Sequence, residues 1–361
     1  MTRHLEGDPA RLILALDLGQ SKSAFCSFET TTGAADFGQV TTRRTALQQL
    51  LEQKRPQRVV IEIRPLAGWV YDLVYSLKLE IQVADPTQDA WQWKNVKRKT
   101  DQDDALKLAR LSALGQLNLV HIPTPRMRPW RRLIQERVTL VAEETRGKNR
   151  IRALLLAQEQ TWLPGKSGWT KQAVTGLTAA ARPLAECPAE ELWRGILHTE
   201  LQRLHQTATL LKTVDDKLDE LGAGHANVQL LQSIPGVGPR TAEVVATTLD
   251  DPHRFRSGRQ VAAYAGLTPR RWQSSSVDRQ GRISKRGSRT LRWALNQAAW
   301  MAVRYNPWAR AVFTRIKAGK RERAKIAIVA LMRKLLVVAW AMLRDQRRYR
   351  RPVPVAETVA A

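Results

Sequence analysis

The stretch Leu12-Ile-Leu-Ala-Leu-Asp17-Leu18 is a short apolar run that carries one carboxylate, Asp17. A run of this length is typical of a buried β-strand, and Ser23–Phe28 follows it as a candidate hairpin partner. A second run, Arg58-Val-Val-Ile-Glu62-Ile63, is rich in β-branched residues and carries Glu62. The two runs therefore predict two strands of a buried sheet, each with one acidic residue in an otherwise apolar segment.

Helical and extended patterns alternate around these two strands. Helices are expected over Ala46–Lys54 and Trp69–Leu79. A further strand is expected at Ile81–Ala84, closed by Asp85-Pro86. The order strand, hairpin, helix, strand, helix, strand is typical of an α/β domain with a mixed sheet. We assign residues 11–127 to this domain.

The middle of the chain, residues 128–226, has a helical pattern. One helix is expected over Leu133–Leu156, and a loop at Pro164–Gly168 separates it from a second helix. Apolar residues recur along one face of the second helix, as in a helical hairpin or coiled coil. The members of this seam are Leu197, Leu201, Leu204, Ala208, Leu211, Leu218 and Leu221. A packing arm is favoured here over any functional site.

The last segment, residues 227–345, is expected to be mainly helical and to end with a helix over Ala324–Arg344. Apolar helical patterns place several tryptophans in its core, namely Trp293, Trp300 and Trp340. Residues 346–361 form a basic, proline-containing tail that we expect to be flexible. The fold class is therefore α/β plus all-α, with a mixed-sheet domain, a helical arm and a mainly helical C-terminal domain.

Positive charge dominates the composition: 59 Lys and Arg residues stand against 33 Asp and Glu residues, a formal net charge of +26. A nucleic acid is the simplest partner, because each well-placed cation releases counterions from a phosphate backbone. A membrane is disfavoured, because the most apolar run, Ile326–Trp340, is interrupted by Arg333 and Lys334. No signal peptide is evident, and Cys26 and Cys187 offer no disulfide framework, so we expect a cytoplasmic protein.

The acidic residues indicate metal-dependent chemistry on phosphodiesters. The stretch Lys99-Thr-Asp101-Gln-Asp-Asp104-Ala105 supplies two carboxylates three positions apart, which a helix start places on one face. Together with Asp17 and Glu62 they make a set of four, as the two-metal sites of ribonuclease H-type nucleases require. Hard oxygen ligands suit Mg²⁺, whereas the six scattered histidines lack zinc-binding spacing.

Other readings of these carboxylates stay open from the residues alone. Each one singly is more often a turn or cap residue, and Asp101 could cap a helix that begins near Asp104. Asp103 and Asp85 are further candidates. However, Asp103 points off the face that Asp101 and Asp104 share, and Asp85 precedes a proline in a turn. The four carboxylates lie on two predicted strands and one predicted helix start, and this joint placement favours a metal site over four separate turn or cap residues.

Two stretches of the last segment have features of nucleic-acid contact. The glycines of Ile234-Pro-Gly-Val-Gly-Pro-Arg-Thr-Ala242 predict a helix-hairpin-helix element that binds phosphate, and a plain interhelical turn is the alternative. Between Thr268 and Lys325 lie 16 Lys and Arg residues but only 2 acidic ones. The candidate contact residues are Gly236, Gly238, Arg240, Arg270, Arg271, Trp272, Arg282, Lys285 and Arg286. The triplet Ser274–Ser276 is ordinarily a polar loop, and a nucleophile is the other reading.

The order of several motifs resembles the DEDD transposases of bacterial insertion sequences, which have an N-terminal RuvC-like domain and a C-terminal transposase domain. The matching pieces are LALDLGQSK, KTDQDDA, ERVTLVAEETRGKNRIRALL, SIPGVGPRTA, FRSGRQVAAYAGLTPRR and ISKRG. The resemblance runs over nearly the whole chain, from Leu14 to the region of Leu343. It implies an RNase H-like fold for the first domain.

The resemblance also implies roles for particular residues. The four carboxylates correspond to a magnesium-binding tetrad. Ser274, two residues after the aromatic of the AGLTPRR-aromatic stretch, corresponds to a nucleophile that forms a phosphoserine link with DNA. The loop spacing differs by about one residue from the pattern, so Ser275 and Ser276 stay open as alternatives. Glu62 is followed by Ile63-Arg-Pro65, where such proteins usually have a small residue, Thr or Ser, and Gly.

The resemblance further implies a homodimer that assembles into a homotetramer, with the helical arm in the contacts and the active site shared across subunits. It implies a structured guide (bridge) RNA that pairs with donor and target DNA and so chooses the sites. The sequence thus favours a transposase or site-specific recombinase. The alternatives are a RuvC-like junction resolvase or nuclease that uses metal-activated water, and a non-catalytic nucleic-acid-binding protein.

Overall fold

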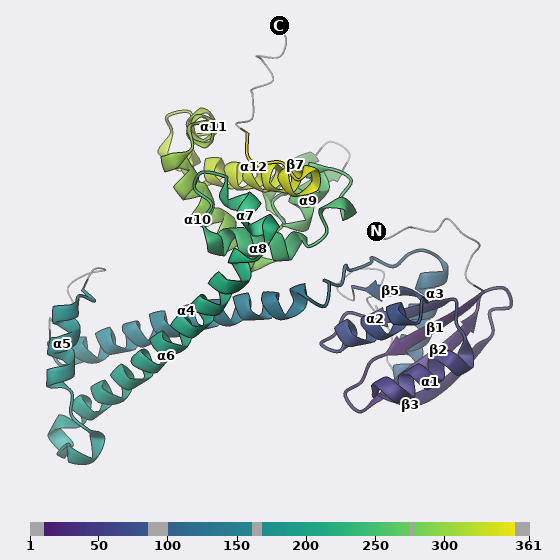
Figure 1. Cartoon of the computed structure of the whole chain (residues 1–361), viewed down its shortest axis with the longest axis horizontal. Helices are drawn as coiled ribbons and strands as arrows, with labels where there is room; N and C mark the ends of the chain where they lie inside the picture. Colours follow the sequence, from purple (N-terminus) through teal and green to yellow (C-terminus); the bar gives the residue numbers. More distant parts are fainter. Residues whose placement is uncertain (1–10, 86–99, 161–167, 275–276, 351–361) are drawn as a thin grey trace, which may run out of the picture. The chain divides into compact units, whose positions relative to one another are not determined.

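The computed structural model of the chain describes residues 11–85, 100–160, 168–274 and 277–350. It divides into two compact units, one that ends at Arg128 and one that begins at Pro129 (Figure 1). We call them the N-terminal unit and the C-terminal unit. Each contains its own clusters of buried apolar side chains, so each is described as a separate body.

The N-terminal unit is built on one five-stranded sheet in the order β3-β2-β1-β4-β5. The pairs β1–β2 and β2–β3 are antiparallel, whereas β1–β4 and β4–β5 are parallel. Parallel neighbours need a crossover connection, and helices supply it here. The strands are β1 (Leu12–Asp17), β2 (Lys22–Glu29), β3 (Ala35–Thr41), β4 (Arg58–Glu62) and β5 (Glu80–Ala84).

Helices cover both faces of this sheet. They are α1 (Arg44–Lys54), α2 (Ala67–Ser76) and α3 (Asp101–Ala113). The crossover helices α1 and α2 pack on the face that holds Leu14 and Leu16, and α3 packs on the opposite face, against Ile13 and Ala15. Successive side chains of a strand point to opposite faces. The odd-numbered residues of β1 therefore face α3, and Asp17 is the last of them.

The predicted mixed α/β architecture is confirmed, and the sheet has one strand more than the sequence indicated. This strand, β3, lies at the edge and has mostly exposed side chains. Its Gly38 is the register partner of Phe25, and a Cβ there would lie 2.5 Å from the Phe25 ring. An edge strand with exposed side chains lacks the continuous apolar run that identifies the inner strands, so the pattern did not reveal it.

Two long helices, α4 (Met127–Ala157) and α6 (Leu192–Ala223), form an arm in the C-terminal unit, with α5 (Lys171–Ala180) at one end (Figure 1). A buried cluster at that end consists of Ile151, Leu155, Leu177, Ala180 and Leu197. In the predicted seam, Leu197 and Leu218 are fully buried, whereas Ala208 between them is exposed. The helices of the arm therefore pack at both ends of the seam, and their supercoiling stays a prediction.

The other helices of the described C-terminal unit pack around α12. They are α7 (Ala226–Gln232), α8 (Pro239–Leu249), α9 (Gly258–Tyr264), α10 (Arg289–Tyr305) and α11 (Pro307–Lys317), with α12 itself at Ala324–Asp345. Within the described ranges α12 is the one helix long and apolar enough to cross a membrane. More than half of its most apolar stretch is buried against its neighbours, and Trp340 donates its indole N–H to the Pro252 carbonyl at 2.8 Å. The helix is therefore a core element of this unit.

A two-stranded antiparallel hairpin, β6 (Pro269–Ser274) and β7 (Val277–Ile283), interrupts the helices between α9 and α10. Of the triplet for which a polar loop was one reading, Ser274 ends β6, so that reading is wrong for Ser274, and Ser275 and Ser276 lie outside the described residues. The hairpin stands apart from the larger sheet as a separate two-stranded sheet. Its described side chains are mostly exposed, so its sequence has no apolar alternation from which strands could be predicted.

An ionic network connects the arm to α8. Arg240 of α8 donates two hydrogen bonds to the Glu243 carboxylate, at 3.0 and 2.9 Å. The same guanidinium lies 3.3 Å from Asp215 of α6 and also pairs with Asp219. Arg137 of α4 pairs with Asp215 at 2.6 Å. The network therefore ties α4, α6 and α8 together at one end of the arm.

The stability of the C-terminal unit is expected to fall as pH rises from about 4.5 to about 7 because of Glu243. Burial raises the pKa of this carboxyl from 4.5 to about 7, although Arg240 opposes the shift. In that window the folded state holds a proton that the unfolded state has released, which costs at most about 1.4 kcal/mol per pH unit. Glu243→Gln is expected to remove this slope, measured by chemical unfolding followed through tryptophan fluorescence.

Thr247→Val provides the matched control for Glu243→Gln. Thr247 lies one turn further along α8 and is also buried, but its hydroxyl does not titrate in this range. Its replacement is expected to change stability equally at every pH. A pH slope that is the same in Glu243→Gln and in the unmodified protein would contradict the prediction.

Candidate active site

Asp17 and Glu62 lie at the carboxyl ends of two neighbouring parallel strands. Leu16 and Ile61 are register partners, and the two carboxylates are the next residues along β1 and β4. Val60 packs in the cluster beneath α3, so Glu62, two residues later, is on the α3 face as Asp17 is. Both side chains are largely buried, with 13% of Asp17 and 12% of Glu62 exposed. Strand pairing therefore brings together two residues that are far apart in sequence.

The first turn of α3 brings two more carboxylates to this face of the sheet. Thr100 caps the helix, because its hydroxyl accepts from the Asp103 backbone N–H while the Asp103 carboxylate accepts from the Thr100 N–H. The reading of Asp101 as the cap is therefore wrong, and Asp103 serves in the capping box. Asp104 is buried next to Ala105, which packs on the sheet, whereas Asp101 is exposed one turn earlier.

The four carboxylates share one electrostatic environment. Burial raises the pKa of Asp17, Arg64 opposes this shift, and the negative charges of Asp104, Asp101 and Glu62 raise the pKa further. The Arg64 guanidinium lies 3.5 Å from Asp17 and 3.1 Å from Glu62. Burial and the neighbouring negative charges both disfavour the ionised form of Asp17, and a bound cation would offset both effects.

The chemistry of the donor set suits a hard divalent cation, because all four residues offer carboxylate oxygens. Within the described ranges, no three Asp, Glu, His or Cys side chains are close enough together to hold a metal ion as they stand. In this arrangement Arg64 supplies positive charge to Asp17 and Glu62. Metal binding therefore requires side chains to turn, and the assignment of the four ligands stays a prediction.

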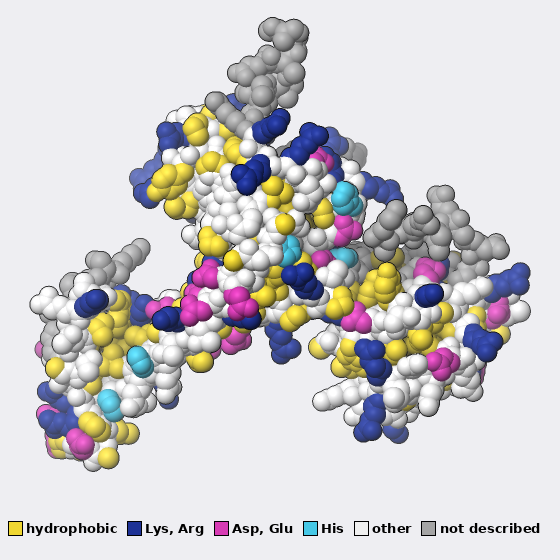
Figure 2. All heavy atoms as spheres, in the orientation of Figure 1, with side chains coloured by type: hydrophobic (Ala, Val, Ile, Leu, Met, Phe, Trp, Pro, Cys, Tyr) yellow, Lys and Arg dark blue, Asp and Glu magenta, His cyan; other side chains and the backbone are white. Residues whose placement is uncertain are grey.

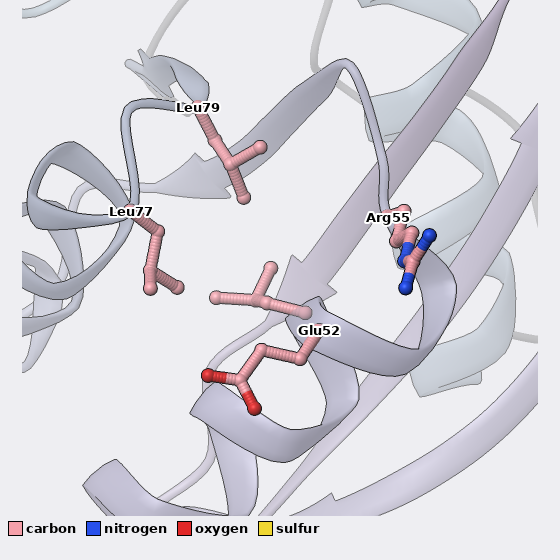
Figure 3. A pocket seen from close by; sticks show the side chains of 5 residues that line it. Glu52, Arg55, Leu77 and Leu79 are labelled. Carbon is pink, nitrogen blue, oxygen red and sulfur yellow. The ribbon is translucent and has the colours of Figure 1, made fainter.

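A pocket of about 290 Å³ lies at the other end of the sheet (Figure 3). It is lined by Leu51, Glu52, Arg55, Leu77 and Leu79. Arg55 precedes β4 and Leu79 precedes β5, so the pocket is at the amino ends of these parallel strands. Asp17 and Glu62 are at the carboxyl ends, and the pocket is therefore separate from the carboxylates.

Ser274 is the last residue of β6, at the tip of the hairpin in the C-terminal unit. Its side chain is exposed, and its register partner is Val277. The alternatives Ser275 and Ser276 lie outside the described residues. A hydroxyl at Ser274 is thus accessible to a large substrate such as DNA, while the four carboxylates belong to the other compact unit.

Close backbone packing holds the base of the hairpin. Gly266, shortly before β6, has a φ of +67°, and a Cβ there would lie 2.0 Å from the backbone oxygen of Arg286. Arg292 of α10 donates to the carbonyl oxygens of Ala265 and Gly287, at 3.1 and 3.0 Å. The AGLTPRR motif leads into β6 and the ISKRG motif follows the end of β7, so the two motifs are held side by side at the base of the hairpin.

Gly266→Ala is expected to destabilise the C-terminal unit by about 3 kcal/mol or more, because the new methyl meets backbone that cannot rotate away. Gly319→Ala is the matched control: its φ is +73°, but nothing lies within 4 Å of a Cβ there. The control is expected to lower the free energy of unfolding by only about 1 kcal/mol, because alanine is strained in the left-handed conformation. Chemical unfolding measures both losses, and equal losses would contradict the role of the close approach.

The predicted helix-hairpin-helix stretch forms a short turn between α7 and α8. Gly236 has a φ of +97°, and a Cβ there would lie 2.5 Å from the backbone nitrogen of Ala302 in α10. Gly238 is the N-cap of α8, and nothing lies within 4 Å of a Cβ placed on it. Arg240 is engaged by the ionic network described above. The close packing of this turn against α10 thus explains why residue 236 is a glycine. Phosphate binding by the turn stays a prediction.

Exposed basic side chains surround the hairpin. Those predicted from the sequence are Arg270, Arg271, Arg282, Lys285 and Arg286, and each of them is exposed. Lys and Arg side chains outnumber acidic ones on the face of the C-terminal helices and hairpin that Figure 2 shows. The side chain of Trp272 lies outside the described part of the structure. The surface suits a polyanion, while contact of each residue with nucleic acid stays a prediction.

Two features were missed or wrongly predicted from the sequence. Arg64 was not a candidate, because an arginine in a loop has no local pattern that reveals its partners. Trp293 and Trp300 were expected in the core, but they are 49% and 45% exposed. They lie on the side of α10 away from Ala294 and Ala298, which are buried. An apolar residue within a helical pattern is thus not always on the buried face.

Two models of known protein families match this chain. The model of the "Transposase IS116/IS110/IS902 family" matches residues 228–314, in the C-terminal unit. A DEDD-type model described as "Transposase" matches residues 14–158, which include most of β1, the other four strands of the larger sheet and the whole of α4. A domain of the DEDD type implies a requirement for a divalent metal ion in general.

Individual relatives agree with the family models. The protein y4rJ of Sinorhizobium fredii, named as a transposase, is 32% identical over 312 residues, which cover 78% of this chain and 76% of y4rJ. The transposase for insertion sequence element IS1111A of Coxiella burnetii is 26% identical over 350 residues, covering 94% and 91% of the two chains. The pilin gene-inverting protein of Moraxella bovis is 36% identical over 123 residues, covering 33% and 38%. The chain therefore belongs to the IS110 family of DEDD transposases of insertion sequences, enzymes that cleave and rejoin DNA.

Proposed function

We propose that this transposase cleaves and rejoins DNA through a covalent phosphoserine link to Ser274, assisted by a Mg²⁺ site formed by Asp17, Glu62, Asp101 and Asp104. The observation that supports it best is the convergence of three chain segments. The ends of β1 and β4 and the start of α3 bring four carboxylates to one face of one sheet. Metal-assisted phosphodiester chemistry requires such a set.

The carboxylates have complementary positions for this role. Asp17 and Glu62 project from a rigid sheet, and the buried Asp104 faces them from α3. Asp101 is exposed one turn earlier, where a DNA strand can approach. When bound here, a divalent ion supplies positive charge that stabilises the charge developing on phosphate oxygens. The N-terminus of α3 points the positive end of its dipole to the same place.

The proposed chemistry of Ser274 consists of two balanced exchanges. In cleavage, its Oγ attacks the phosphorus of a phosphodiester, a new P–O bond forms, and the P–O bond to one deoxyribose breaks. The serine hydroxyl releases its proton, and the departing deoxyribose oxygen takes up one. In rejoining, a deoxyribose hydroxyl of another strand attacks the phosphoserine and frees Ser274. Because each step exchanges one phosphate ester for another, no external energy source is needed.

The carboxylates and Ser274 belong to different compact units. We propose that a homodimer, assembling into a homotetramer, shares its sites across subunits. The arm offers apolar side chains for such contacts: Leu156, Ile196 and Leu210 are 77%, 48% and 56% exposed. They lie on two helices of the arm, Leu156 on α4 and the other two on α6.

A structured guide RNA, which pairs with donor and target DNA, completes the proposal. The net charge of +26 and the exposed cations around the hairpin support a polyanionic partner larger than one short DNA duplex. The protein is proposed to act in the cytoplasm, where the DNA and a transcribed RNA are both present. Sequencing of the RNA that copurifies with the protein tests this part directly.

A second function fits the same carboxylates, namely hydrolysis of DNA by metal-activated water, as in a RuvC-like junction resolvase or nuclease. One observation favours it: all four carboxylates lie in the N-terminal unit, without a contribution from the unit that holds Ser274. A non-catalytic nucleic-acid-binding role is the remaining alternative.

Trapping of the covalent link distinguishes these functions. The full-length protein with its copurified RNA is incubated with Mg²⁺ and DNA that carries donor and target sites, and the products are separated under denaturing conditions. A protein–DNA adduct whose nucleotide maps to Ser274 by mass spectrometry is the expected result. Cut DNA without an adduct would favour hydrolysis, and intact DNA would favour binding alone.

A further inference from the structure

Arg64 contacts two of the four candidate carboxylates. It lies in the segment between β4 and α2, two residues after Glu62. Its Nη2 is 3.1 Å from Glu62 Oε2 and 3.5 Å from Asp17 Oδ1. The guanidinium thus bridges two carboxylates that come from neighbouring strands, at the place where the proposed metal ion needs their oxygens.

The bridge has a clear electrostatic cause. The side chains of Asp17 and Glu62 are 13% and 12% exposed, and Asp104 with 7% exposure faces them from α3. Negative charges on one poorly solvated face of the sheet repel one another. One guanidinium offsets part of this repulsion, because it can donate to two carboxylates at once.

The side chain of Arg64 can also move away from the two carboxylates while the backbone around it stays folded. Its side chain is 42% exposed, about three times as much as either partner. Its backbone oxygen accepts a hydrogen bond from the Ala67 N–H at 3.0 Å, at the start of α2. The main chain is thus held in place while the long side chain can rotate about its own bonds into solvent.

We propose that Arg64 is a displaceable counter-ion of the carboxylate site, which competes with the divalent cation for Asp17 and Glu62 and so lowers the affinity of the site for metal. This inference rests on the proposed metal site. The cation enters only as the guanidinium swings out, since both positive groups require the same oxygens. The affinity of the four carboxylates for the metal ion is therefore lower than it would be without Arg64. An anion that binds the Arg64 guanidinium, such as a DNA phosphate, would raise this affinity.

Binding of Mn²⁺ to the full-length protein tests the proposal without measuring activity. Mn²⁺ takes the same oxygen ligands as Mg²⁺, and its free and bound forms are distinguished by electron paramagnetic resonance. Arg64→Gln is expected to lower the Kd for Mn²⁺ about 5- to 30-fold, the range that two partly exposed ion pairs can supply. Arg44→Gln is the matched control, because Arg44 is exposed at the start of α1, which packs on the opposite face of the sheet.

The outcomes separate this inference from the proposed metal site. If neither the unmodified protein nor Arg64→Gln binds Mn²⁺, or if Asp104→Asn binds it as well as the unmodified protein, the metal site itself is wrong. If the unmodified protein binds and Asp104→Asn does not, the metal site stands. Arg64→Gln with an unchanged or a higher Kd then overturns the counter-ion role, as does an equal change in Arg44→Gln. Circular dichroism of each variant verifies that the sheet is folded.

Discussion

Replacement of Ser274 by Ala is expected to abolish the covalent protein–DNA adduct and to lower strand transfer by about 10⁴-fold or more, as loss of a nucleophile does in other covalent enzymes. Alanine lacks the oxygen that forms the bond to phosphorus, and water at this exposed position leads to hydrolysis rather than to a link that can be rejoined. The side chain is exposed at the hairpin tip, so folding is expected to change by less than about 0.5 kcal/mol.

Denaturing gels measure the adduct, and sequencing of junctions measures strand transfer. Ser284→Ala is the control within the same hairpin, because Ser284 directly follows β7 at its base, where its N–H bonds to the Thr268 carbonyl at 2.8 Å. The control is expected to retain both the adduct and strand transfer. Single replacements of Ser275 and Ser276 complete the set. An adduct that persists in Ser274→Ala but disappears in one of these two would assign the nucleophile to the neighbour.

Asp104→Asn is expected to lower DNA cleavage by about 10³-fold or more, because an amide cannot supply the negative charge that a metal-binding carboxylate supplies. Asp104 is buried, and its negative charge raises the pKa of Asp17, so its charge acts at the site with little screening by water. Asparagine keeps the size of the side chain. Cleavage of DNA at saturating Mg²⁺, with the fold monitored by circular dichroism, measures the effect.

Asp103→Asn is the matched control for Asp104→Asn. The two aspartates are adjacent, but Asp103 accepts hydrogen bonds from the Thr100 N–H and hydroxyl in the capping box. Its replacement is expected to cost at most about 1 kcal/mol of stability and to leave cleavage within a few-fold of the unmodified protein. Cleavage that survives in Asp104→Asn but is lost in Asp103→Asn would reverse the assignment of the two residues.

Ser274→Ala and Asp104→Asn, each with its control, together distinguish a serine nucleophile from hydrolysis by water. Loss of cleavage in both Ser274→Ala and Asp104→Asn indicates one active site with contributions from two units. Cleavage that continues in Ser274→Ala but not in Asp104→Asn indicates metal-dependent hydrolysis. Ser274 and the carboxylates are in separate compact units, so this comparison is the most direct measure of whether they work together.

Local patterns were enough to predict the inner strands and the long helices. The apolar run before Asp17 and the β-branched run before Glu62 are β1 and β4, and the apolar pattern over Ala324–Arg344 is α12. The two strands are buried on both faces and so appear as uninterrupted apolar runs, and the helix has an apolar face that recurs with the helical period, so all three are visible in the order of residues. The edge strand β3 and the β6–β7 hairpin have no such pattern, because most of their side chains contact solvent.

The residue order also selected the four candidate carboxylates, because an acidic residue within an apolar strand or at a helix start is conspicuous along the chain. Their common face is a property of the folded chain. Asp17 and Glu62 meet because β1 and β4 pair in parallel in one register, and a shift of one residue would turn Glu62 to the α1 and α2 face. The partners of Arg64 and Arg240, and the role of Asp103 in capping, likewise depend on elements that the chain brings together only when it folds. Periodicity is a local property of the backbone, whereas ion pairing depends on distances across segments far apart in sequence, and those distances exist only in the tertiary structure.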